Sequence, residues 1–229
     1  FVDIAQWIGS DMTERDKVIV ISEKEARQND AGRVLRSVID RCNIHYTPFS
    51  YSILEGRDIQ ATLEAAMTKE GVNRVVIASE SEAFVNDAVR NLNLIVHNKY
   101  DVVLYAPAKI RTFETIEVEN FHNTSLHASL SYYINYDNDS GVKDFIKKYR
   151  AMFGTEPTQF AFQGYDLATY FIDLVSRYGE NWSDMMPENE KKMLQSTFRF
   201  RKAGNEGGYI NNGVKRISYE EGWKVKEQD

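Results

Sequence analysis

The chain has 229 residues, of which 42% are hydrophobic and 27% are charged, so it can bury a core and does not have the composition of a disordered chain. Its formal net charge is -6, which argues against nucleic acid and anionic membrane as partners, because proteins that bind them usually present a basic face. The sequence contains no apolar run close to the roughly 18 residues that a membrane-spanning helix needs.

The start of the chain already has helical spacing, since Phe1, Ile4, Ala5 and Ile8 share one helical face. Phe1 is not an initiator residue, and we therefore expect a fragment of a longer protein, with any targeting signal upstream. Residues 11–16 are polar and predict a linker. The single cysteine, Cys42, has apolar neighbours and is expected to be a buried, inert thiol.

Short apolar runs then alternate with helical patterns. The runs at residues 17–22, 74–79 and 101–106 end abruptly at small or polar residues, which is typical of strands buried on both faces. Residues 45–53 predict a further strand, and Pro48 indicates that it lies at a sheet edge. Helical spacing fills the gaps at residues 31–43, 59–70 and 82–92, with Ser81 or Glu82 at the start of the last helix. Strict alternation from Leu126 to Ile134 predicts a fifth strand within residues 120–136.

The pattern changes after the polar break at residues 137–140. Residues 142–153 predict a helix that Gly154 ends, and residues 161–175 predict a second that Gly179 ends. A weaker helix is expected at residues 188–194. Strands are expected at residues 197–201, 213–219 and 223–226, separated by glycine-containing turns.

Alternating strands and helices predict an α/β fold with a doubly wound, mostly parallel sheet in the order 2-1-3-4-5. The chain then changes direction between the first and third strands, and ligands of such sheets bind beyond the carboxyl ends of the strands at that point. The residues expected there are Ser22, Glu23, Ser79, Glu80, Ser81, Ala106 and Pro107. Ser79 and Ser81 have two open roles, which are capping of the next helix and contact with a ligand.

Enzyme chemistry has little support in the sequence. The four histidines lack metal-ligand spacing with one another or with Cys42, and there is no GxSxG, P-loop or GxGxxG motif. We therefore expect no catalytic residue, no metal and no cofactor.

Two segments carry a resemblance to a known family. Tyr149, Phe153, Gly154 and Pro157 match the pattern Y-x-x-x-F-G-x-x-P, and residues 160–168 read FAFQGYDLA, with Leu167 ahead of the usual alanine. In these features the chain resembles the type I periplasmic solute-binding proteins of the branched-chain amino acid receptor group. The resemblance covers nearly the whole chain and rests on packing motifs.

The resemblance implies a two-lobed protein that closes over a small ligand about three crossing segments, here near residues 11–16, 136–139 and 196–198. Residues 17–136 and 198–229 would form the second lobe. Residues 1–10 and 140–195 would be helical remnants of the first lobe, whose sheet is missing. The apolar stripes of the helices at residues 142–175 should then pack on each other, on a second copy of the chain, or be displaced.

By position, the family's ligand contacts fall at residues 25–29, 79–81 and 106–109. The candidate ligand-binding residues are therefore Ser22, Arg27, Gln28, Ser79, Glu80, Ser81 and Pro107. Amino-acid receptors of the family often place an acid in the third loop, but here it reads Ala106-Pro107-Ala108. Three alternatives follow: Glu80 replaces that acid, the ligand is of another kind, or binding is lost.

The functional expectation is a non-catalytic solute-binding module of a bacterial envelope, in the periplasm or cell envelope, that binds an amino acid or similar ligand for ABC-type uptake or sensing. The alternative is an envelope scaffold or sensor that has kept the fold and lost the ligand. The partners implied are a small molecule, an ABC permease or upstream peptidoglycan-associated domains such as LysM repeats, and a second copy docked through exposed first-lobe helices.

Overall fold

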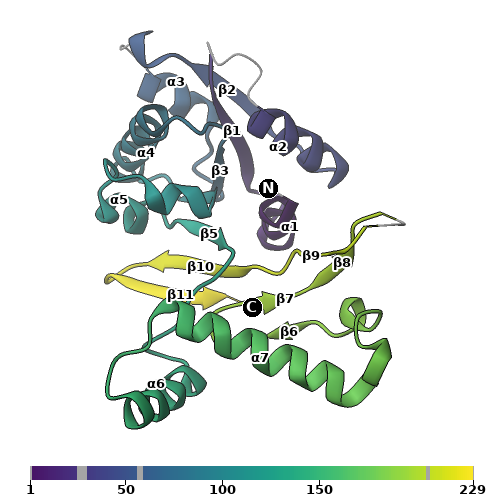
Figure 1. Cartoon of the computed structure of the whole chain (residues 1–229). Helices are drawn as coiled ribbons and strands as arrows, with labels where there is room; N and C mark the ends of the chain where they lie inside the picture. Colours follow the sequence, from purple (N-terminus) through teal and green to yellow (C-terminus); the bar gives the residue numbers. More distant parts are fainter. Residues whose placement is uncertain (1, 25–29, 56–58, 205–206, 229) are drawn as a thin grey trace. The chain divides into compact units, whose positions relative to one another are not determined.

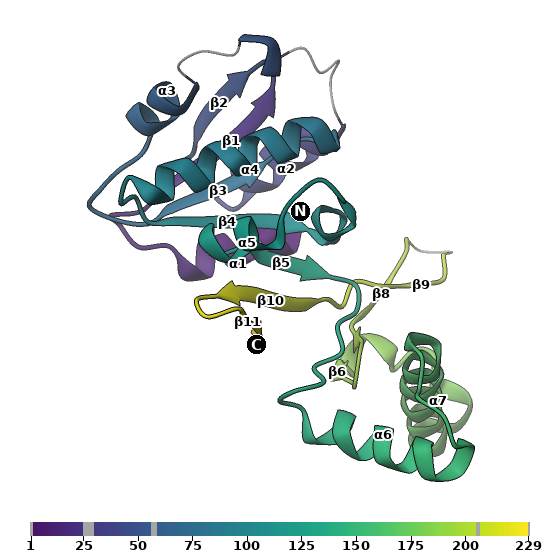
Figure 2. The same cartoon turned by 90° about the vertical axis from the view of Figure 1, so that its left-hand side faces the viewer.

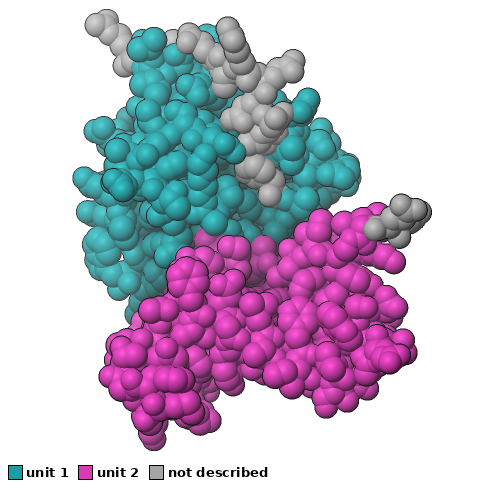
Figure 3. All heavy atoms as spheres, viewed as in Figure 1, with its two compact units in different colours: residues 1–129, 216–229 teal, residues 130–215 magenta. Residues whose placement is uncertain are grey.

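The computed structural model describes residues 2–24, 30–55, 59–204 and 207–228. Within these ranges the chain forms two compact units (Figure 3). Unit 1 comprises residues 1–129 and 216–229, and unit 2 comprises residues 130–215. None of the helices in the described ranges combines the length and the apolar character that crossing a membrane requires.

Unit 1 is built on a seven-stranded sheet in the order β11-β10-β5-β4-β3-β1-β2. Its strands are β1 (Lys17–Glu23), β2 (Thr47–Tyr51), β3 (Asn73–Ile77), β4 (Val102–Pro107), β5 (His127–Leu130), β10 (Lys215–Glu220) and β11 (Lys224–Gln228). The pairs among β1 to β5 are parallel, whereas β10 and β11 are antiparallel. The expected order 2-1-3-4-5 and the α/β class are thus confirmed. Pro48 lies in β2, at the sheet edge, as expected.

Helices cover both faces of this sheet. They are α1 (Val2–Asp11), α2 (Asp30–Arg41), α3 (Ile59–Ala66), α4 (Glu82–His97), α5 (Val118–Asn123) and the 3-10 helices η1 (Ile53–Glu55) and η2 (Ala108–Thr112). Figures 1 and 2 show α1 and α2 on one face, and α3, α4 and α5 on the other. Val18 and Val20 of β1 join the core beneath α1 and α2, and the alternating Ile19 and Ile21 are buried as well. Burial on both faces explains the continuous apolar run of β1.

Helix α1 packs within unit 1, and the lobe to which residues 1–10 belong stays a prediction. Its residues Ile4, Ala5, Trp7 and Ile8 are buried in the core that also contains strand β1. Residues 11–16, expected as a crossing segment, likewise fall inside unit 1. The assignment of residues 140–195 to a remnant of another lobe stays a prediction.

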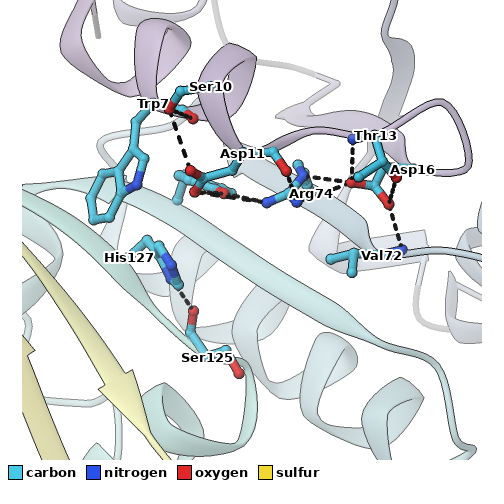
Figure 4. A network of polar contacts seen from close by, with 10 residues as sticks. Trp7, Ser10, Asp11, Thr13, Asp16, Val72, Arg74, Ser125 and His127 are labelled. Atoms are coloured by element: carbon cyan, nitrogen blue, oxygen red, sulfur yellow. Dashed lines mark hydrogen bonds and ion pairs between the residues drawn. The ribbon is translucent and has the colours of Figure 1, made fainter. Parts of the chain in front are cut away.

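A buried polar network joins the end of α1 to the sheet (Figure 4). The Arg74 guanidinium donates to Asp16 at 3.0 Å and to the Tyr105 hydroxyl at 2.6 Å, and Nη2 donates to the Asp11 carbonyl at 2.5 Å. Tyr105 in turn donates to the Asp11 carboxylate at 3.0 Å. Asp16 also accepts from the backbone of Thr13 and of Val72. The buried arginine is therefore fully engaged, as burial of a charge requires.

Close backbone approach explains one glycine beside this network. A Cβ on Gly71 would collide with the carbonyl group of Arg15. Only glycine lets the chain before β3 pass so near the turn at residues 13–16.

In unit 1, one sequence-based expectation holds only in part and another is wrong. The fifth strand lies within residues 120–136 as expected, but it is confined to His127–Leu130, and residues 118–123 form α5. The helix buries Asn120 and Phe121 together, which an alternating strand would not do. Cys42 is exposed, because α2 ends at Arg41 and Asn43 turns the chain with a φ of 54°.

Unit 2 consists of two long helices and short strands. Its elements are α6 (Ser140–Phe153), α7 (Gln159–Tyr178), η3 (Gly179–Asn181), η4 (Met186–Glu188), β6 (Lys191–Lys192), β7 (Thr197–Phe198), β8 (Phe200–Lys202) and β9 (Tyr209–Asn211). Gly154 ends α6 with a left-handed φ of 69°, as the sequence predicts. The weak helix expected at residues 188–194 is absent from this described stretch, where η4 leads into β6. Tyr170 holds the bend by donating to the Asn189 carbonyl at 2.9 Å.

The two long helices of unit 2 pack partly on each other. The Phe145 ring of α6 lies 4.6 Å from Phe162 and 4.8 Å from Tyr165 of α7, measured between ring centroids. Asp166 of α7 is fully buried, and its carboxylate accepts hydrogen bonds from the backbone of Leu194, Gln195 and Ser196. The family-like segment at residues 160–168 therefore has a structural role, which is to hold the 194–196 loop.

Candidate functional site

The carboxyl ends of β3 and β4 in unit 1 open onto a pocket of about 290 Å³. This volume is near the lower end of the range for small-molecule sites. Apolar side chains form its walls, namely Ile77, Val85, Ala106, Ile110 and Phe113. The other lining residues are Ser79, Glu80, Pro107 and Lys109. The pocket is thus mainly apolar, with one acid and one base among its lining residues.

Local sequence explains the shape of the β4 side of the pocket. Pro107 ends the strand with a φ of -71° and a ψ of 167°, and η2 begins at the next residue. This tight helical turn brings Lys109 and Ile110 into the pocket lining. Ile110 is only 3% exposed, so the turn is anchored in the core.

The segment that carries Phe113 is attached to the start of α4. The Glu82 carboxylate accepts hydrogen bonds from the Thr115 backbone N–H and hydroxyl, both at 2.9 Å. These hydrogen bonds lower the pKa of Glu82. Glu82 therefore stays ionised at neutral pH and keeps Phe113 near the pocket.

The charged residues of the pocket are paired with each other. Lys109 Nζ lies 3.1 Å from Glu80 Oε2. The two side chains are 48% and 64% exposed, and such solvated pairs contribute only about 0–1 kcal/mol. A ligand that offers both a cationic and an anionic group can replace this pair at little energetic cost.

The structure brings three of the candidate ligand-binding residues together in the pocket lining, Ser79, Glu80 and Pro107, along with Ala106, which was also expected at this edge of the sheet. Ser81 caps α4 instead, since its hydroxyl accepts from the Phe84 N–H at 3.4 Å. Ser79 accepts from the Ser81 N–H at 3.1 Å, so it has a turn role and also lines the pocket. Ser22 lies elsewhere, with its hydroxyl 2.6 Å from that of Ser50 on β2.

Arg27 and Gln28 lie outside the described residues. Sequence reasoning did not single out Lys109, Ile110 and Phe113, which line the pocket. The resemblance gave a signal for Lys109, because residues 106–109 correspond to a contact loop of the family. Phe113 has no such local signal, since its position depends on the hydrogen bonds between Thr115 and Glu82.

The described part of the chain offers no candidate metal site. No group of three or more His, Cys, Asp or Glu residues within these ranges is placed to hold a metal ion.

Comparison with known proteins gives structural matches only, since no protein-family model and no curated protein sequence matches the chain. An ABC transporter substrate-binding protein from Desulfitobacterium hafniense, in complex with Leu, matches with a TM-score of 0.58 and 15% identity over 99% of this chain. The leucine-binding protein LivK from Thermotoga maritima matches with a TM-score of 0.52 and 14% identity over all of it. The C-domain of LpoA from Haemophilus influenzae, a regulator of PBP1A, matches with a TM-score of 0.53 and 12% identity, also over the whole chain.

The chain spans 65%, 63% and 65% of the length of these three proteins, so about a third of each has no counterpart here. At 12–15% identity the comparisons establish the fold. The resemblance is therefore confirmed at that level: this chain has the α/β fold of type I periplasmic binding protein lobes, similar to substrate-binding proteins of the branched-chain amino acid type.

Proposed function

We propose that the chain belongs to a non-catalytic solute-binding protein of the bacterial periplasm or cell envelope, and that it holds a small amino acid with an apolar side chain. The observation that carries this proposal is the Glu80–Lys109 ion pair among the residues lining a mainly apolar pocket. A free amino acid has the matching chemistry, with one ammonium, one carboxylate and a side chain to bury.

In the proposed complex, Glu80 binds the ligand's ammonium and Lys109 binds its carboxylate. The side chain packs against Ile77, Ile110 and Phe113, where burial contributes roughly 25 cal/mol for each Å² of apolar surface. Glu80 thereby takes the place of the acid that the family often has in the third loop. The Leu complex of the Desulfitobacterium hafniense protein and the leucine-binding protein of Thermotoga maritima support this class of ligand.

The wider role follows the same proposal. Residues 17–136 and 198–229 would form one ligand-binding lobe, and residues 140–195 would belong to another that closes over the ligand. The loaded protein would deliver its ligand to an ABC permease or signal its presence.

Saturation-transfer NMR with L-leucine tests the proposal, because it detects binding even at millimolar dissociation constants. We expect a leucine signal with the 229-residue chain, and its loss in Glu80→Gln and in Lys109→Met. Lys148→Met is the matched control, since Lys148 also forms an exposed ion pair, with Asp144 of α6. A folded protein that gives no leucine signal, or one whose signal survives both pocket substitutions, contradicts the proposal.

A second candidate function is an envelope scaffold that has lost the ligand and acts through a protein partner. The observation that favours it is the exposed apolar surface of α6 and α7 in unit 2. Met152 is 75% exposed, Phe160 73% and Ile172 68%. Such surfaces mark interaction sites, and the match to the LpoA C-domain, described as a regulator of PBP1A, supports a partner-binding role. The partner we propose first is a second copy of the chain.

Sedimentation equilibrium tests this second candidate. We expect concentration-dependent dimers, and at least a tenfold weaker association in Ile172→Lys. Lys109→Met serves as the control, since Lys109 is 48% exposed and lies in unit 1, outside the α6 and α7 sequence. A chain that stays monomeric at all concentrations contradicts the scaffold with a second copy as partner.

A further inference from the structure

A second pocket, of about 300 Å³, lies in unit 1 away from the candidate ligand site. It is formed by the end of α5 and the turn between β10 and β11, which Figure 1 shows on the left of the molecule. Its lining includes Glu119, His122, Asn123, Ser125, Glu221 and Trp223. Ser125 precedes β5, so this pocket is near the amino end of a parallel strand, whereas the first pocket lies at the carboxyl ends.

Hydrogen bonds fix the parts of this pocket to one another. His122 Nδ1 lies 2.7 Å from the Glu220 carbonyl, which can only accept, so Nδ1 carries the proton and Nε2 is left as an acceptor in the neutral ring. Asn123 donates to Asn93 of α4 at 2.9 Å. The Tyr219 N–H donates to the Leu126 carbonyl at 2.8 Å. The pocket is therefore bounded by elements that hold one another in place.

Trp223 lies in the turn between β10 and β11, next to Gly222. Its φ is 63°, a left-handed value that bulky residues rarely adopt, and its side chain is 65% exposed. Burial of the indole does not explain a tryptophan at this strained position. Ser125, which also lines the pocket, has a φ of 46°. Both values belong to turns, Trp223 to the one between β10 and β11 and Ser125 to the one that follows α5, and these turns present the two residues to the pocket.

Aromatic rings and negative charge meet in this pocket. The Trp223 ring lies 5.1 Å from the His122 ring, and His122 packs in turn on Tyr219, a buried residue outside the lining, with 5.0 Å between centroids. Glu119 and Glu221 are the charged residues among the lining side chains, and no lysine or arginine is among them. Carboxylates and the faces of aromatic rings both attract cations.

We propose that this pocket binds a small organic cation of the alkylammonium class. The cationic group lies against the Trp223 ring, and the carboxylates of Glu119 and Glu221 balance its charge. The site is separate from the proposed amino-acid pocket and does not depend on it.

Titration with choline, followed by the indole N–H signal of Trp223 in NMR spectra, tests this site. The neutral isostere 3,3-dimethyl-1-butanol is the comparison ligand, since it has the same shape without the charge. We expect a saturable shift with choline, at least tenfold weaker binding of the isostere, and weaker choline binding as salt rises. Equal binding of the two compounds, a larger response to a neutral sugar such as N-acetylglucosamine, or no response to choline overturns the proposal.

Substitutions locate the site and guard against misfolding. Glu221→Gln changes an exposed side chain at the turn and should weaken choline binding at least threefold without changing the melting temperature. Trp223→Gly relieves the left-handed strain, so it should melt no lower than the parent chain yet lose choline binding, measured by isothermal titration calorimetry because this variant lacks the indole signal. Trp182→Phe, in unit 2, is the matched tryptophan control and should bind choline normally. Unchanged binding in both Glu221→Gln and Trp223→Gly contradicts the assignment.

Discussion

Replacement of Arg74 by methionine tests whether the buried network holds α1 to the sheet. Methionine replaces the aliphatic stem of arginine but lacks the guanidinium group with its charge and its donors. In the native protein the Arg74 and Asp16 side chains are 9% and 3% exposed, with the charged atoms 3.0 Å apart. The substitution therefore leaves a buried carboxylate without its cationic partner. It also deprives the Tyr105 hydroxyl and the Asp11 carbonyl of their donors.

The magnitude follows from the surroundings of Asp16. Removal of one partner from a buried ion pair costs about 3–5 kcal/mol. Asp16 still accepts from Thr13 and Val72, and these donors stabilise the remaining charge. We therefore expect the lower end of the range, a loss of about 3 kcal/mol in the free energy of unfolding. The double variant Arg74→Met with Asp16→Asn should recover at least about 1 kcal/mol of the lost free energy of unfolding, because it removes the unpaired carboxylate charge.

The chain has three tryptophans, so the effect in unit 1 is measured by urea denaturation in a background with Trp182→Phe and Trp223→Phe, where the fluorescence is that of Trp7. The Trp7 ring lies 5.7 Å from that of Tyr105, so its emission reports on α1 and the sheet together. Lys109→Met is the matched control in the same unit, since Lys109 is 48% exposed in its pair with Glu80. It should lose at most about 1 kcal/mol. A loss below about 1 kcal/mol in Arg74→Met, or strict additivity with Asp16→Asn, refutes the reasoning.

Two further predictions concern His127 and Asp166. Burial lowers the pKa of His127 from its ordinary 6.5, so that, as the pH falls, the unfolded chain binds a proton at a higher pH than the folded chain does. The neutral, buried His127 therefore contributes its full stability above pH 6.5, and this contribution is lost as the pH falls below 6.5. The melting temperature of His127→Phe should therefore fall less between pH 7.5 and 5.5 than that of the parent chain. An equal fall in both proteins contradicts this. Asp166→Ala leaves three backbone N–H groups without their acceptor and should lower the free energy of unfolding, measured by urea denaturation, by at least about 3 kcal/mol. Asp166→Asn should show an intermediate loss. The control on the same helix is Asp173→Ala, because Asp173 forms a partly exposed ion pair with Arg177; its free energy of unfolding should fall by at most about 1 kcal/mol. A similar fall in both alanine variants contradicts the role of Asp166.

The sequence by itself determined the features that depend on local periodicity and on single capping residues. The apolar run of β1 indicates burial on both faces, Pro48 indicates an edge, and Ser81 and Gly154 mark helix ends, because each of these signals acts over a few residues. The order of the parallel strands followed from the alternation of strands and helices. Three candidate ligand residues also followed, since the carboxyl ends of neighbouring parallel strands meet at one edge of the sheet.

Only the tertiary structure decided which distant residues meet. Lys109 pairs with Glu80 from 29 positions away, and Arg74 meets Asp16 across 58. Residues 118–123 became helical although apolar alternation follows them, because α5 buries Phe121 in unit 1. Trp223 is exposed at a left-handed position that the pairing of β10 with β11 creates. Local propensities are worth at most about 1 kcal/mol per residue, so burial and long-range hydrogen bonds override them wherever the two compete.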